Sequence, residues 1–489
     1  MSSTGLAETR RGGRPAPYRA LVQRWLPLLT VIATIDITLA YAVVDHGAGE
    51  IILAGGIGIA LLALCILRPR PALLAFVAFW GVAHVLLSSG SLEATGGAST
   101  SISQLFGATV VLGLVTAAAP NSRSASRQVP LPLRLFGVFA FLYTVAELIT
   151  PLHVAGLSDL AKLLGGLALA FVGYYMIDNE KRLLSLARAV SVSGLLVALV
   201  ALVQAIAGSS FGLESYAQDT GPYRATSALG SASATADFLL ICAGFALLRY
   251  TLQRDKDRRR GRADLAILAV VSLGIVVTLT RADIIALVVM LVVWTGLWQM
   301  RSVSAIGIRT RLALTLVAIA VVGVYAVGSA TLSSRLQDLN PSSGATFLNG
   351  RGAIWSNELQ TLHSADVSAI LIGSGAHTSY TSVYLAQSDK SREFPPHDLF
   401  LWLAIETGAV GLIVYVSALF TLGRSLLIAA RRSRFTPAGQ VAAVALATTI
   451  AFTLDSMFHN TQVSTGSDWY FMLFVGATLR MIEPRSWKN

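Results

Sequence analysis

Residues 264–299 read DLAILAVVSLGIVVTLTRADIIALVVMLVVWTGLWQ, which is two apolar runs separated by Thr280-Arg281-Ala282-Asp283. Each run is about as long as the roughly 17 to 25 residues with which an α-helix crosses a bilayer. The interruption leaves almost no loop, so the sequence is compatible with a tight external turn or with a broken helix. Runs of this kind fill the chain and predict an all-α polytopic membrane protein.

The composition agrees with that class of protein. Of the 489 residues, 54% are hydrophobic and only 13% are charged, whereas a soluble domain carries about 25% charged residues. The net charge of +11 would suggest nucleic acid binding in a soluble protein. Here the positions of the charges indicate membrane topology instead.

Apolar windows predict about fourteen transmembrane helices. The predicted spans lie near residues 26–44, 49–67, 71–89, 102–119, 131–150, 157–177, 186–207, 229–249, 264–280, 282–299, 311–329, 398–422, 438–456 and 467–482. One long water-compatible stretch, residues 330–397, interrupts them. Such a stretch is typical of an external loop that carries function.

Basic residues mark alternate connections between the predicted spans. Arginines and lysines are dense in the N-terminal tail and at residues 254–262 and 424–434, and they are sparse by comparison at 330–397. The positive-inside rule places the basic connections in the cytoplasm. The predicted organisation is a basic cytoplasmic tail (1–25), helices one to eleven (26–329), an external catalytic loop (330–397), helices twelve to fourteen (398–482) and a cytoplasmic tail (483–489).

The sequence supports neither a metal site nor a bound cofactor. Cys65 and Cys242 are the only cysteines, so neither a disulfide framework nor a thiolate zinc site is expected. No two histidines have the i, i+4 spacing of a helical zinc motif. Asp255-Lys256-Asp257 has the carboxylate spacing of many soluble glycosyltransferases, but it lies in a dense basic cytoplasmic run and indicates a solvated loop.

Two arginines stand beside apolar helix on the predicted external side. Arg224 lies in Gly221-Pro222-Tyr223-Arg224, and Arg281 lies in the interruption quoted above. An arginine at the edge of a span costs about 2.5 to 3.5 kcal/mol on insertion scales, so it usually has an anionic partner. A guanidinium group matches phosphate oxygens bidentately. Both arginines are therefore candidates for binding a phosphorylated substrate.

The same arginines also have an alternative interpretation within the protein. Arg281 could pair with Asp283, and Arg224 with Asp219 or Asp237. Such pairs would simply neutralise charge near the membrane. Sequence spacing leaves this alternative open.

His397 is the candidate for acid–base chemistry. The external loop ends in Phe394-Pro395-Pro396-His397-Asp398 and runs directly into an apolar segment, so an imidazole stands where water meets bilayer. Histidine is the side chain most often used to accept a proton from a reacting hydroxyl. A structural role is also open, because polar residues at a helix start satisfy free backbone N–H groups. Asp398 and Glu406 are likewise favoured near a helix N-terminus whatever their function.

The external residues resemble the O-antigen ligase and polymerase superfamily, in which a large external loop ends in Pro-His-Asn before a Glu-x-Gly-x-x-Gly-Leu helix. Here the matching segments are Pro396-His397-Asp398 and Glu406-Thr407-Gly408-Ala409-Val410-Gly411-Leu412. Three further segments look like the family's Gly-Arg…Trp, Gly-x-Gly and Ser-Arg patterns: Asn349-Gly350-Arg351-Gly352-Ala353-Ile354-Trp355, Ile372-Gly373-Ser374-Gly375 and Leu279-Thr280-Arg281. The resemblance covers about residues 221–422. It departs from the family at Asp398, where Asn is usual, and at Ala282, where Gly follows the arginine.

The resemblance implies a GT-C-like membrane glycosyltransferase that uses a polyprenyl-diphosphate-linked glycan and needs neither a metal ion nor another cofactor. Arg224 and Arg281 would stabilise the diphosphate, and His397 would orient or deprotonate the acceptor hydroxyl, with inversion at the anomeric carbon. The residues expected to bind substrate are Arg351, Trp355, Tyr223, Asp398 and Glu406. For Arg351 and Trp355, packing of the loop on the membrane domain is the alternative.

Three functions compete at this stage. A polymerase joins lipid-linked repeat units, a ligase moves finished glycan to another acceptor, and a transporter performs no chemistry. A transporter is expected to show inverted repeats and paired broken helices near the midplane, and neither is clear; the number of spans favours a polymerase. The expected partners are the polyprenyl-diphosphate-linked donor, a glycan or lipid acceptor, the bilayer and polysaccharide-assembly proteins, with no nucleic acid. The expected location is the plasma (inner) membrane of a bacterium, with both termini cytoplasmic and the site on the external, periplasmic side.

Overall fold

A computed structural model gives the fold of a large part of the chain. It describes residues 59–88, 102–118, 128–149, 154–209, 211, 224–254, 256–299, 351–375, 378–379, 381–385, 390–394, 397–433, 436–459 and 467–483. The predicted spans near 26–44 and 311–329, most of the span near 49–67, and the candidate residue Tyr223 lie outside these residues.

The described chain is built almost entirely of helices. They are α3 (Pro69–Ser88), α4 (Ile102–Ala118), α5 (Leu131–Ile149), α6 (Val154–Met176), α7 (Glu180–Ala207), η1 (Ser227–Leu229), α8 (Ala232–Gln253), α9 (Arg258–Val277), α10 (Arg281–Gln299), α13 (Arg351–Ser364), α14 (Val367–Ile372), α15 (Leu399–Glu406), α16 (Gly408–Arg432), α17 (Pro437–Ser456) and α18 (Ser467–Ile482). Ten of them, α3 to α10, α17 and α18, correspond closely to predicted spans.

Six of the described helices are long and apolar enough to cross a membrane. These segments are Leu131–Leu148, Asp159–Met176, Glu180–Ala207, Ala232–Gln253, Gly408–Arg432 and Pro437–Ser456. The protein is therefore a multi-pass membrane protein. The total of about fourteen spans and the GT-C-like architecture stay predictions.

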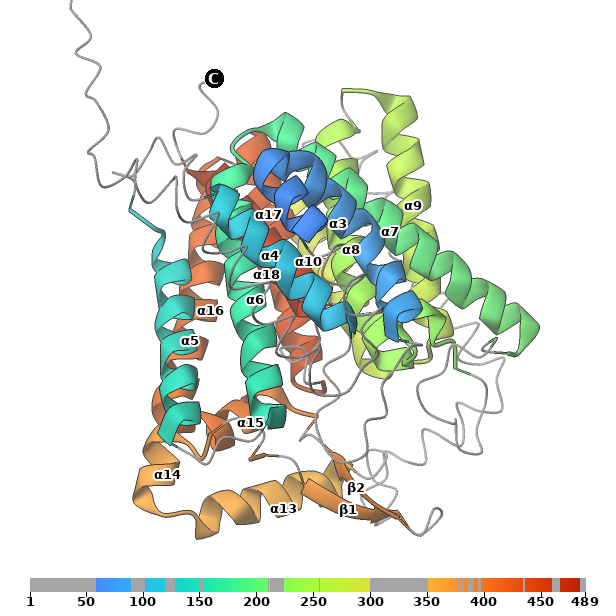
Figure 1. The fold of residues 1–489 in the computed structure, drawn as a ribbon. Coiled ribbons are helices and arrows are strands. Elements are labelled where there is room, and N and C mark those ends of the chain that lie inside the picture. Colours follow the sequence, from blue (N-terminus) through green and yellow to red (C-terminus); the bar gives the residue numbers. More distant parts are fainter. Residues whose placement is uncertain are drawn as a thin grey trace, which may run out of the picture.

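The helices pack into one bundle with α8 near its centre (Figure 1). Helix α8 is buried along most of its length, because α7, α9 and α17 pack against it. Helices α5 and α16 pack on each other at one side of the bundle, while α6 packs chiefly on α18. The elements α13, α14 and α15 lie together at one end of the bundle, next to the hairpin described below.

The segment predicted to be the external loop, which keeps that name below, contains the strands of the described chain. Strands β1 (Thr381–Leu385) and β2 (Lys390–Phe394) form an antiparallel hairpin in which Thr381 pairs with Phe394 and Leu385 with Lys390. The prediction of an all-α protein is therefore wrong for this short segment. Alternation of apolar and polar residues in Thr381–Leu385 is weak, so the sequence pattern does not predict the strand.

Two helix junctions decide the shape of the site. Residues 278–280 form the short non-helical connection between α9 and α10, so α10 begins at Arg281. The predicted continuous helix near 398–422 is wrong, because the chain breaks at Thr407 between α15 and α16. Gly408 has a φ of +65° at this break, a conformation that glycine adopts without steric cost.

Candidate active site

Arg224 is hydrogen-bonded to the turn that precedes Arg281. Its Nε donates to the carbonyl oxygen of Thr278 at 3.1 Å, and its Nη2 donates to Oγ1 of Thr280 at 3.2 Å. The backbone N–H of Ala225 also donates to the carbonyl oxygen of Val277 at 3.3 Å. The two arginines predicted from separate parts of the sequence therefore belong to one corner of the molecule.

The turn at this corner is held by its own side chains. Thr278 and Thr280 are buried, and Leu279 between them has a left-handed φ of +56°. Oγ1 of Thr278 donates to the carbonyl oxygen of Ile275 at 2.7 Å, and Oγ1 of Thr280 lies 3.4 Å from the carbonyl oxygen of Ala232. A non-glycine residue in the left-handed region persists only where its surroundings impose it. The corner is thus a fixed platform for the start of α10.

His397 occupies the junction between the hairpin and α15. It is half-buried, and its φ of +54° is again left-handed. The next residue, Asp398, is the N-cap of α15 and accepts hydrogen bonds from the N–H groups of Phe400 and Leu401 at 2.8 and 2.9 Å. Burial raises the pKa of Asp398 above its ordinary value, and the two N–H donors act in the opposite direction. The cap therefore fixes the direction in which the chain passes from His397 into the helix.

Glu406 joins three parts of the structure below that junction. Its side chain is fully buried; Oε2 accepts a hydrogen bond from the Tyr143 hydroxyl and Oε1 accepts one from the Ser379 hydroxyl, both at 2.7 Å. Helix α15 is too short to cross a membrane and lies outside the six candidate spans. Burial raises the pKa of Glu406 to about 8. In this structure Glu406 connects α5, α15 and the external loop, and direct contact with substrate stays a prediction.

The Gly-x-Gly turn packs on the break between α15 and α16. The N–H groups of Ser374 and Gly375 donate to the carbonyl oxygens of Ile405 and Glu406 at 2.9 and 3.1 Å. A Cβ atom on Gly373 would lie 2.2 Å from the Glu406 carbonyl oxygen, and one on Gly408 would lie 2.4 Å from the Leu371 carbonyl oxygen. Two motifs that resemble the O-antigen ligase family are therefore in backbone contact.

The remaining predicted residues lie on α13 or outside the described part of the chain. Arg351 is the first residue of α13, and its side chain is outside the part that the structure describes. Trp355 is half-buried one turn later on the same helix, which packs on α15 and β1. Tyr223 precedes the described residues that begin at Arg224.

A group of four side chains was missed in the sequence. Asp237, Asp283, Asp455 and His459 are all buried, and within the described ranges they are a group whose ligand atoms are close enough together to hold a metal ion. Among the described residues, the ion pairs of Asp237 and Asp283 are made with His459, and Asp219, the other predicted partner of Arg224, lies outside these residues. The i, i+4 spacing of Asp455 and His459 is the signal that was available.

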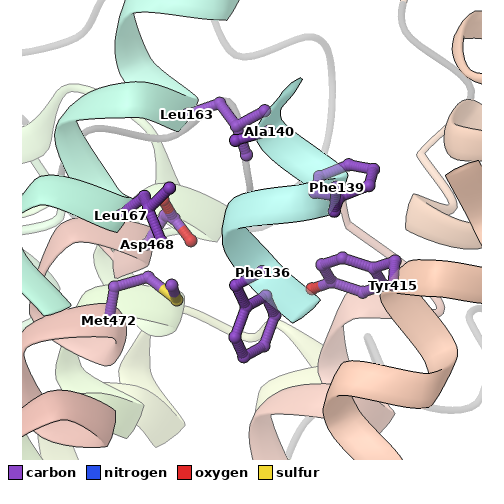
Figure 2. Close-up of a pocket in the computed structure, with 8 residues that line it drawn as sticks. All are labelled: Phe136, Phe139, Ala140, Leu163, Leu167, Tyr415, Asp468 and Met472. Carbon is purple, nitrogen blue, oxygen red and sulfur yellow. The ribbon is translucent and has the colours of Figure 1, made fainter. Parts of the chain in front are cut away.

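A small cavity separates the α5/α16 pair from the α6/α18 pair (Figure 2). Its volume is about 10 Å³, which is about the room that one water molecule needs. The lining is mostly apolar, with the Asp468 carboxylate as its charged group, and comprises Phe136, Phe139, Ala140, Leu163, Leu167, Tyr415, Asp468 and Met472. An apolar lining suits hydrocarbon better than sugar or phosphate.

Residues 265–416 match the family model described as O-antigen ligase. This segment is similar to an O-antigen ligase domain. It begins in α9, ends in α16, and includes Arg281, His397 and Glu406. Its presence supports a role in glycan transfer and implies lipid-linked glycan substrates in a membrane setting. A search of the curated proteins found no match to this chain.

Proposed function

We propose that the protein is an inverting glycosyltransferase that polymerises polyprenyl-diphosphate-linked glycan repeat units on the external face of a bacterial plasma membrane. The observation that carries this proposal is the hydrogen bonding of the Arg224 guanidinium to the turn that precedes Arg281. Arg281 lies inside the segment that matches the O-antigen ligase family, and Arg224 precedes that segment in the chain. Two cationic groups at one corner suit a ligand with two linked phosphates.

In the proposed reaction, an acceptor hydroxyl oxygen bonds to the anomeric carbon of the donor glycan as the bond from that carbon to the diphosphate oxygen breaks. Polyprenyl diphosphate leaves with the bonding electrons, and Arg224 and Arg281 stabilise its charge. His397 orients the acceptor hydroxyl and takes its proton. The chemistry needs no metal ion or other cofactor, because diphosphate is already a good leaving group. Attack from the side opposite the diphosphate inverts the anomeric centre.

In this proposal, Asp398 and Glu406 hold His397 in position. Asp398 caps α15, and Glu406 holds that helix to α5 and to the external loop, so the helix that follows His397 is held in place. Preorganised groups contribute to catalysis because they need no rearrangement in the transition state. We therefore place Asp398 and Glu406 in positioning roles, and Arg351, Trp355 and Tyr223 in contacts with the glycan.

The lipid part of the donor needs an apolar surface between helices. The cavity between the α5/α16 and α6/α18 pairs has a mostly apolar lining (Figure 2). We propose that the two helix pairs move apart at this gap to receive part of the polyprenyl chain. Contact between a hydrocarbon chain and the phenylalanine side chains of this gap would bury apolar surface, which is favourable in free energy.

The test is glycan transfer by the purified full-length protein from a polyprenyl-diphosphate oligosaccharide, measured with and without a chelator. Wild type is compared with His397→Ala and Arg281→Ala. His363→Ala is a matched control, because His363 is an exposed histidine on α13 of the same loop. Arg134→Ala is the arginine control, since Arg134 lies near the start of α5 and its side chain donates to the Val129 carbonyl oxygen.

Each outcome of this assay separates two interpretations. Longer lipid-linked products that are lost in both site variants and kept in both controls support the polymerase. Product on a different lipid or protein acceptor supports a ligase instead. Unchanged transfer by the site variants refutes the assigned residues, and no transfer to any acceptor favours a transporter.

A further inference from the structure

Three helices bring four ionisable side chains together in the interior of the bundle. Asp237 comes from α8, Asp283 from α10 and Asp455 from the last turn of α17, and His459 follows three residues after that helix ends. None of the four is more than 4% exposed. One ligand atom from each lies within 4.8 Å of the others.

The contacts within this group leave several of its buried polar atoms without a hydrogen-bond partner among the described residues. Nδ1 of His459 lies 3.0 Å from Oδ1 of Asp237, 3.1 Å from Oδ1 of Asp455 and 3.8 Å from Oδ2 of Asp283. One imidazole nitrogen carries at most one proton to share among these acceptors. Both carboxylate oxygens of Asp283, Oδ2 of Asp455 and Nε2 of His459 have no hydrogen-bond partner among the described residues. Buried polar atoms are normally satisfied, so this group calls for a further ligand.

Charge indicates that the missing ligand is a cation. Three carboxylates beside one histidine retain a net negative charge even when the imidazole is protonated, and burying unbalanced charge is costly. A divalent ion would neutralise most of it. Among the described residues, the ion pairs of Asp237 and Asp283 are made with His459.

The spacing of the four groups fits the edges of a metal coordination sphere. Ligand atoms about 2.1 Å from an ion are about 3.0 Å apart at a right angle and about 3.4 Å apart at a tetrahedral angle. The distances of 3.0, 3.1 and 3.8 Å from Nδ1 of His459 to the carboxylates fall around these values. Carboxylate oxygens with one imidazole, and no thiolate, suit Mn²⁺ or Zn²⁺ among the common ions.

We propose that Asp237, Asp283, Asp455 and His459 bind one divalent ion of the Mn²⁺ or Zn²⁺ type between α8, α10 and α17. The ion fixes these three helices to one another, and through Asp283 it fixes the first turn of α10, where Arg281 lies two residues earlier. Its role is structural, because all its ligands come from the chain and the transfer step proposed above does not pass through it. The inference therefore stands whether or not the transfer residues are assigned correctly.

The experiment is metal analysis of the full-length protein, purified in detergent without a metal-affinity resin, by inductively coupled plasma mass spectrometry. We expect about one Mn or Zn per wild-type chain, and at least a tenfold loss of bound metal in Asp283→Asn and Asp455→Asn. Asp468→Asn is the matched control, since Asp468 is a buried aspartate of α18 outside the group, and it should keep the metal.

Thermal unfolding keeps the test decisive if a variant folds poorly. Wild-type protein stripped with a chelator should unfold at a lower temperature and recover when MnCl₂ or ZnCl₂ is added, whereas Asp283→Asn should not respond. Metal-free wild-type protein with no response to either salt would overturn the site and indicate that protons alone neutralise the group. Equal metal content in folded Asp283→Asn and wild type would overturn it too. Transfer activity that is lost with a chelator while the ion stays bound would count against the proposed metal independence only.

Discussion

The hydroxyl of Tyr143 on α5 donates a 2.7 Å hydrogen bond to Oε2 of Glu406, 263 residues later in the chain. Ser379 of the external loop donates to the other oxygen of the same carboxyl group. One fully buried side chain thereby connects a membrane helix, the junction between α15 and α16, and the loop that precedes His397.

Removing the Tyr143 hydroxyl should loosen this connection. Tyr143→Phe leaves a buried carboxyl oxygen without its donor, so we expect a loss of about 1 to 3 kcal/mol in the free energy of unfolding. Tyr250→Phe is the control, because Tyr250 is also buried on a membrane helix but has no hydroxyl hydrogen bond in the described structure. Thermal unfolding in detergent measures both; equal melting temperatures of the two variants would contradict the role of the bond.

Stability should fall as pH rises because of Glu406. Its pKa is about 8 in the folded protein and 4.5 in an exposed chain, so the folded state keeps a proton that the unfolded state loses. The contribution is complete below pH 4.5 and is lost as pH rises through about 8. Wild type should therefore lose more of its melting temperature than Glu406→Gln between pH 6 and pH 9, and parallel losses would rule out this group as the cause.

Replacing Gly408 by alanine should lower the stability of the protein by more than one added methyl group usually does. A Cβ atom there would lie 2.4 Å from the Leu371 carbonyl oxygen, and the residue's φ is +65°. The left-handed conformation alone costs a non-glycine residue about 1 to 2 kcal/mol, and the backbone clash adds to it. Gly423→Ala on the same helix is the control, since its nearest neighbour would be Leu446 Cδ1 at 3.9 Å. A fall in melting temperature confined to Gly408→Ala is expected.

His397 should show opposite effects on stability and on transfer. Its φ of +54° favours glycine, so His397→Gly should be more stable than His397→Ala by about 1 to 2 kcal/mol. Both variants lack the imidazole and should transfer glycan about 10²-fold more slowly than wild type, the lower end of general-base effects. Transfer by His397→Gly at the wild-type rate would exclude the imidazole from the reaction and leave only its backbone role.

Helix positions in the described chain follow from hydrophobicity, which the sequence records directly. Predicted spans near 102–119 and 438–456 correspond to α4 (Ile102–Ala118) and α17 (Pro437–Ser456) with differences of at most one residue. The break at Thr407 was missed because the residues on both sides of it are apolar. A buried glutamate directly before Thr-Gly was the available signal, but its meaning depends on Tyr143 and Ser379, which lie far away in the chain.

The candidate site was predictable to a different degree in each of its parts. Arg224 and Arg281 were identified because charge beside apolar helix is costly, and that cost is a local property. The partners of Asp237 and Asp283 were not, since His459 lies 222 and 176 residues further on, and only tertiary packing brings it close.

The contact between Gly373 and Gly408 closes the base of the external loop with backbone atoms alone. This contact between the two glycines does not depend on the side chains of the β1–β2 hairpin, which lies between them in the chain. Such a contact lets the hairpin be exchanged as a module. Replacing residues 381–394 by the corresponding segment of another O-antigen ligase domain should alter which glycan is accepted while the helices beneath keep their arrangement, so acceptor choice and membrane scaffold can diverge independently.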